Sequence, residues 1–187
     1  MSARLSAAVT VLGTLTGAAR PAADDPKKPA TVGEKVVAFC AEHKGKTVGR
    51  GECADLATEA LKAAGAKGRG EDNPNKEDYT WGELVFTLEA TAAGPKATGK
   101  KADIKPGDVI QFRDTKWVTQ SGNVIKARFA PHHTAVVSKV QNKGAVLKVF
   151  EQNNNGKREV AEGTLQLSAL TEGWVRVYRP VPAEDEK

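Results

Sequence analysis

The chain has 187 residues, of which 40% are hydrophobic and 27% are charged. This length allows one domain of ordinary size with its own core. No apolar run approaches the roughly 20 residues needed to cross a bilayer, so we expect no transmembrane segment. The formal net charge is +5, but the lysines are scattered and lack interleaved aromatics, which argues against nucleic acid as a partner.

The two ends of the chain differ in composition from the rest. Residues 1–23 contain one early basic residue, a small-residue apolar stretch and an abrupt polar end. This layout predicts a secretory signal peptide and therefore a secreted or periplasmic protein; the alternative is a disordered N-terminal tail. We expect a linker at residues 24–33, one domain at 34–182 and a disordered tail at 183–187.

The first half of the domain predicts two helices. One begins at Thr31 or Gly33 and ends near residue 43, and the other runs from Cys53 to about residue 64, where Gly65 stops it. A glycine-punctuated turn separates them. Residues 66–78 are polar and predict a loop, and the sequence from Tyr79 to Gly94 predicts a short strand or a helical turn.

The second half predicts strands. Residues 109–112 alternate after a proline–glycine turn, and "HHTAVVSKV" and "GAVLKVFEQN" are β-rich runs joined by the hairpin signal "QNKG". "GWVRVYRPV" predicts a closing strand. Helices followed by an antiparallel meander indicate an α+β domain.

Cys53 is the first candidate catalytic residue. It follows the glycine-flanked segment "GRGE" and begins a helix, where the helix dipole and unpaired N–H groups stabilise a thiolate and can hold an oxyanion. The alternative is a cysteine that only fills a helix start. Cys40 has helical apolar neighbours and is expected to be a buried free thiol, although a disulfide between the two cysteines remains open.

His132 and His133 stand together at the head of a predicted strand. Strand alternation places His133 on one face with Ala135 and Val137, as a base that points into a cleft lined by the sheet would be. Adjacent strand residues point to opposite faces, so the pair is poorly suited to binding one metal ion. We expect no metal and no cofactor.

Glu151 and Asn153 share a strand face with Leu147 and Val149. A carboxylate or amide there, one hairpin away from His133, could orient the imidazole. The alternative is a polar strand end that runs into a surface turn.

The order of these elements resembles the CHAP family, the cysteine- and histidine-dependent amidohydrolases and peptidases, and more distantly the NlpC-type enzymes. The resemblance covers roughly residues 34–180, and the segments that carry it are "GEC" ending at Cys53, "PGDVIQF" at 106–112, "HHTAVV" at 132–137 and "EQN" at 151–153. His132 replaces the small residue usual before the histidine, and two polar insertions border the expected groove.

The resemblance implies a papain-like fold in which N-terminal helices pack on an antiparallel sheet. It also implies an exported enzyme that hydrolyses an amide bond through a thioester, with peptidoglycan or a peptide as substrate. In it Cys53 is the nucleophile, His133 the acid and base, and Glu151 the orienting group, assisted by Asn153. Tyr79, Trp81 and Trp117 are candidates to line the groove, or else core residues. We expect a monomer. The alternatives are a catalytically silent module that binds envelope peptides or a protein partner, and an amidohydrolase acting on a small amide.

Overall fold

The computed structural model describes residues 30–73 and 78–184, so the predicted signal peptide lies outside the described residues. Helix α1 spans Val32–Glu42 and helix α2 spans Cys53–Ala63. Thr31 caps α1, because its hydroxyl accepts a hydrogen bond from the Glu34 N–H while the Glu34 carboxylate accepts from the Thr31 N–H. Both helices therefore form where the sequence predicts them, and they precede all the described strands.

Nine strands follow the helices in the described part of the chain. Their bounds are β1 Gly70–Asn73, β2 Asp78–Thr80, β3 Glu83–Thr91, β4 Gly94–Gly99, β5 Val109–Ser121, β6 Val124–Gln141, β7 Val146–Glu151, β8 Ala161–Gln166 and β9 Leu170–Arg179. Strands β1 and β2 pair antiparallel; β1 lies within the segment predicted as a loop, and β2 begins at the last residue of that segment. The other seven form one antiparallel sheet in the order β4-β3-β9-β5-β6-β7-β8.

The sheet corrects the predicted meander. The last strand, β9, lies between β3 and β5 and pairs with both of them. The segment predicted as a short strand or helical turn is instead half of the β3–β4 hairpin. With two helices and a seven-stranded sheet, the domain is mostly β.

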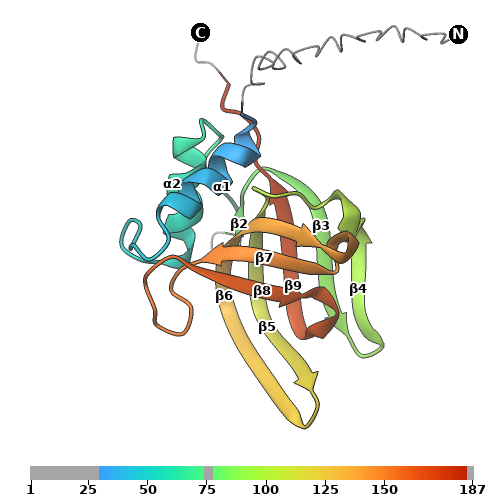
Figure 1. The fold of residues 1–187 in the computed structure, drawn as a ribbon. Helices are drawn as coiled ribbons and strands as arrows, with labels where there is room; N and C mark the ends of the chain where they lie inside the picture. The colour runs from blue at the N-terminus through green and yellow to red at the C-terminus, as the bar shows by residue number, and fades with distance from the viewer. Residues whose placement is uncertain (1–29, 74–77, 185–187) are drawn as a thin grey trace, which may run out of the picture.

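Two hydrophobic cores lie on opposite faces of the sheet. One buries the helices against strand residues such as Val109, Val136 and Phe150. The other contains Phe112 and Val137, and no residue of α1 or α2 is among its members. Neighbouring residues such as Val136 and Val137 enter different cores, as strand alternation requires. In Figure 1 the two helices lie together at one end of the sheet.

Strands β5 and β6 extend beyond their neighbours as a long hairpin, which projects at the bottom of Figure 1. We call its outer part, residues 115–130, the arm; the sequence analysis treated most of it as a polar insertion. Phe112 and Trp117 enter the same core although five residues separate them. The positive φ of 51° at Asp114 interrupts the alternation between them, so the faces of β5 change at the base of the arm.

Candidate active site

The first component of the site is the turn that presents Cys53 at the start of α2. The Asp55 carboxylate accepts hydrogen bonds from the backbone N–H groups of Arg50 and Glu52, at 2.8 and 3.2 Å, and so ties the turn to the first helical residues. Gly49 has a φ of 59°, and a Cβ atom there would approach the Asp55 Cβ to 2.9 Å. This close approach explains a glycine at that position. The thiol is partly exposed.

His133 lies on β6 between Cys53 and Glu151. Its Nε2 atom is 3.0 Å from Glu151 Oε2, and the ring is near enough to the Cys53 thiol for that group to raise its pKa. Because Nε2 is engaged by Glu151, Nδ1 is the nitrogen available to the thiol. The structure thus brings together a cysteine, a histidine and a carboxylate in the order that nucleophilic catalysis uses.

The environment favours a charged pair between His133 and Glu151, although both are buried. Burial alone would lower the pKa of His133, but hydrogen bonds and charge interactions with Cys53 and Glu151 outweigh it, so this pKa is raised. Burial would likewise raise the pKa of Glu151, but His133 and Arg128 outweigh it and lower that pKa. Both shifts stabilise an imidazolium beside a carboxylate.

Arg128 is a fourth member of this cluster that the sequence analysis did not single out. It reaches Glu151 from the arm with two donors: Nη2 lies 2.6 Å from Oε2 and Nη1 lies 3.3 Å from Oε1. Asn154 also donates to Oε1, at 2.8 Å. Glu151 therefore pairs with two cations, Arg128 and protonated His133. No local sequence signal links residue 128 to residue 151, because the contact depends on how β6 is placed beside β7.

Gln152 connects this strand end to the Cys53 turn. Its side chain accepts from the Val48 N–H at 3.1 Å, and its Nε2 donates to the carbonyls of Val48 and Glu52 at 2.9 and 2.7 Å. The motif "EQN" contained this residue, but no role was given to it. It is fully buried, so it fixes the distance between the two halves of the site.

The side chain of Asn153 points to Glu52 and not to the imidazole of His133. Its Nδ2 donates to Glu52 Oε2 at 2.8 Å. It has a positive φ of 55°, so the chain leaves the strand geometry that the face assignment assumed. Glu151, and not Asn153, is the residue that hydrogen-bonds His133.

The three aromatic candidates lie in different surroundings. Trp81 is fully buried in the helix-side core and donates from Nε1 to Gln111 Oε1 at 3.0 Å, so its assignment to a groove is wrong. Tyr79 is partly buried and packs edge-on against Trp81 and His132. Trp117 is 4% exposed and contributes to the pocket described next.

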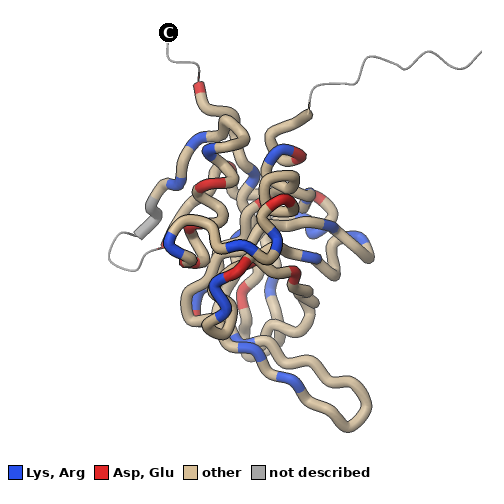
Figure 2. Tube along the Cα trace, turned by 60° about the vertical axis from the view of Figure 1, so that its left-hand side comes forward, with Lys and Arg blue, Asp and Glu red and all other residues tan. Residues whose placement is uncertain are grey.

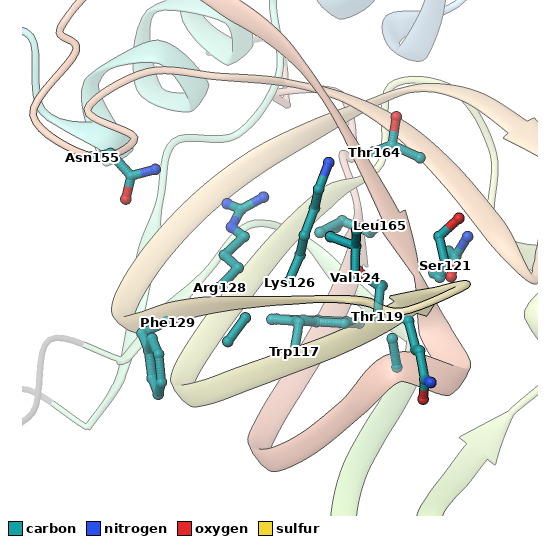
Figure 3. A pocket seen from close by; sticks show the side chains of 14 residues that line it. Trp117, Thr119, Ser121, Val124, Lys126, Arg128, Phe129, Asn155, Thr164 and Leu165 are labelled. Atoms are coloured by element: carbon teal, nitrogen blue, oxygen red, sulfur yellow. The ribbon is translucent and has the colours of Figure 1, made fainter.

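A pocket of about 710 Å³ lies between the arm and β8. Its lining includes Trp117, Lys126 and Arg128 from the arm and Thr164 and Leu165 from β8. Figure 3 shows Lys126 and Arg128 projecting from β6 toward the strand that carries Thr164. Arg128 borders this pocket and also contacts Glu151, so the pocket adjoins the Cys53–His133–Glu151 cluster.

Cys40 is a buried free thiol, and burial raises its pKa to about 12. Within residues 30–73 and 78–184, no group of three or more histidine, cysteine or acidic side chains could hold a metal ion. No helix in the same ranges combines the length and apolar character that spanning a membrane requires.

Comparison with known proteins identifies the family of the fold. Residues 27–186 match the family described as the AIM3/BBC1 cysteine proteinase-fold domain. A curated relative is Altered inheritance of mitochondria protein 3 from Debaryomyces hansenii, 31% identical over 154 residues. The match covers 81% of this chain but 16% of that protein. These findings support a papain-like cysteine proteinase fold, and they do not specifically support the CHAP or NlpC families.

Two solved structures are also similar. The crystal structure of Ly7917 has a TM-score of 0.46 and 17% sequence identity, and its complex with the hydrolyzing product of MDP has 0.45 and 18%. Each match covers 81% of this chain and 63% of the other.

The predicted secreted or periplasmic location is wrong, because the curated relative is a yeast protein named for the inheritance of mitochondria, which points to a role inside the cell.

Proposed function

The chain belongs to the AIM3/BBC1 family of cysteine proteinase-fold domains, and from that premise we propose that it is a cysteine hydrolase of amide bonds in polypeptides. The observation that carries the proposal is the position of His133, which hydrogen-bonds Glu151 and lies beside Cys53. A cysteine that only filled a helix start would need neither partner.

The proposed reaction has two steps. In the first, the Cys53 thiolate attacks the amide carbon, and the His133 imidazolium gives its proton to the departing amine, which leaves a thioester on Sγ. In the second, neutral His133 takes a proton from water, and the hydroxide formed attacks the thioester and releases the acid and the thiolate. Glu151 stabilises the imidazolium that forms in each cycle. The N–H groups at the start of α2 are the candidate donors to the oxyanion.

A second function is binding of a protein partner without turnover. The comparisons favour it over hydrolysis, because the curated relative is named for the inheritance of mitochondria and not for a reaction. The double contact of Arg128 with Glu151 also favours it, since a carboxylate shared between two cations stabilises each of them less. The comparisons give no support to peptidoglycan as the ligand.

One experiment decides between the two functions. The full chain is treated with iodoacetamide near neutral pH, and labelling of Cys53 and Cys40 is followed by mass spectrometry beside hydrolysis of a peptide library. We expect Cys53 to react well before Cys40, and Cys53→Ser to lose all peptide cleavage. Equal labelling of the two thiols would overturn the nucleophile assignment. Fast labelling of Cys53 without any cleavage would favour binding without turnover.

A further inference from the structure

The pocket between the arm and β8 has a one-sided charge. Its lining contains Lys126 and Arg128 and no aspartate or glutamate. The whole arm carries three basic residues and no acidic one, and Figure 2 shows only basic positions along it. Lys116 is neutralised by Glu172 at 2.8 Å. Lys126 has no carboxylate partner among the residues that the structure describes, so its charge is available to a ligand.

Two N–H groups of the lining residues also lack acceptors. Trp117 Nε1 and Arg128 Nε are buried, and neither finds a hydrogen-bond partner within the described chain. A buried donor without an acceptor carries an uncompensated desolvation cost. A ligand that brings acceptors to this wall, with a small shift of either side chain, would recover part of that cost.

The main chain of the arm is also unpaired on one side. Residues 124–135 of β6 pair with β5, and pairing with β7 begins only at Val136. The chain turns away after Glu151, through positive φ values at Asn153 and Asn155. Over the described residues, β6 from Val124 to Ala130 is therefore a free sheet edge that borders the pocket, and Pro131, which has no N–H to donate, ends it two residues before His133. A free edge is a template for an extended peptide.

We propose that the arm docks an acidic polypeptide segment, which adds as a strand to the free edge of β6 and places carboxylates in the pocket beside Lys126 and Arg128. The free edge supplies main-chain hydrogen bonds, which favours a polypeptide over a small anion. Lys126 supplies the preference for acidic side chains, since Arg128 is already paired with Glu151 at the inner end of the pocket. Val124 and Leu165 give apolar contacts for the residues between them. The docked segment would run toward His133, and its binding requires no turnover.

The test uses a fluorescein-labelled decapeptide of alternating glutamate and valine with the full-length Cys53→Ala protein, so that hydrolysis cannot interfere. Fluorescence anisotropy at low salt gives the Kd. We expect replacement of glutamate by glutamine in the peptide to weaken binding about tenfold, or ~1.4 kcal/mol. Methylation of every second peptide nitrogen, which removes strand hydrogen bonds, should weaken it similarly.

Lys126→Gln should weaken binding of the acidic peptide about tenfold. The matched control is Lys96→Gln, an exposed lysine on β4 at the opposite edge of the sheet, which should leave the Kd unchanged. A third peptide carries lysine in place of each glutamate. Equal affinity for the glutamate, glutamine and lysine peptides would overturn the proposal. If inorganic phosphate displaced the acidic peptide at concentrations where chloride has no effect, the proposal of a carboxylate ligand would be overturned in favour of a phosphate ligand.

Three further outcomes are distinguishable. A dimer in sedimentation that Lys126→Gln dissociates would overturn the proposal in favour of a second copy of this chain. Peptide binding with an unreactive Cys53 would overturn the proposed hydrolase and leave the docking site standing. A reactive Cys53 without peptide binding would do the reverse.

Discussion

The inner and outer halves of the β5–β6 hairpin differ in what surrounds them. The inner half, with residues 109–113 paired to 132–136, is covered by a hydrophobic core on each face. On the outer half Val124, Ile125 and Phe129 are 55–67% exposed. One pair of strands thus holds His133 in a well-packed position and presents an exposed surface beside it. The proposed chemistry needs the first property, and the proposed docking needs the second.

The largest expected effect comes from His133→Ala, which removes the chemistry from the inner half. The thiol and the leaving amine both lose their proton partner, so peptide hydrolysis should fall about 10²–10⁴-fold. Iodoacetamide labelling of Cys53 should slow as well. His132→Ala is the matched control, because His132 is the adjacent residue on β6 and packs edge-on against Tyr79. Comparable losses in the two variants would contradict the assignment of His133.

The next largest effect is structural and lies at the base of the arm. Trp117→Ala removes a 96% buried ring from the core and should cost about 3–5 kcal/mol of unfolding free energy. Ile125→Ala, at the exposed tip, should change it by less than about 0.5 kcal/mol. Urea denaturation measures both. If Ile125→Ala proved as costly, the tip would be covered in solution.

Glu151→Gln should alter the pH dependence of the inner half. Without the carboxylate the pKa of His133 falls, so the imidazolium is lost at a lower pH and the basic limb of the pH–rate profile moves down. Turnover should fall about tenfold. Asn153→Ala is the control, since its amide bonds Glu52. An unchanged profile for Glu151→Gln with an inactive Asn153→Ala enzyme would transfer the orienting role to Asn153.

The same variant changes the pH dependence of stability. The raised pKa of His133 stabilises the fold at pH values below the ordinary 6.5, and this contribution is lost as the pH rises through the higher folded value. The lowered pKa of Glu151 stabilises the fold above pH 4.5, and this contribution is lost as the pH falls through the lower folded value. In Glu151→Gln the melting temperature should therefore depend less on pH in both windows.

The smallest effect is expected from Arg128→Gln, which breaks the link between the two halves. Removal of this cation leaves Glu151 to His133 alone, so the basic limb of the profile should move up, opposite in sign to Glu151→Gln. The rate should change only a few-fold, because Arg128 acts through Glu151. A downward move of the limb would show that Arg128 positions the carboxylate more than it competes for it.

Local patterns in the sequence were sufficient for much of this site. The helix start at Cys53, the strand face of His133 and the hairpin that leads to Glu151 depend on periodicities over a few residues, and the structure places all three side chains in contact. The "PGD" turn also carries a local signal: Asp108 accepts from the Lys105 N–H at 2.8 Å.

The features that were missed depend on distant partners. The position of β9 between β3 and β5 requires pairing of residues such as Val175 and Phe112, which no local pattern encodes. Arg128 reaches Glu151 only because the strand faces change near Asp114. The arm alternates weakly, so its sequence was treated as an insertion. Trp81 was misassigned because an aromatic beside a turn has the same composition signal in a groove and in a core.

The position of β9 also constrains how the protein is made. The ribosome must synthesise the chain as far as Arg179 before β9 can join β3 to β5, so the β3–β4 hairpin and the β5–β8 segment are made first and lack the strand that lies between them. Folding that ends with insertion of the last strand between two earlier ones is dominated by distant contacts and is correspondingly slow. Until then the exposed edges of β3 and β5 are sites for mispairing with other chains. Synthesis of this domain should therefore depend on chaperones more than its modest length suggests.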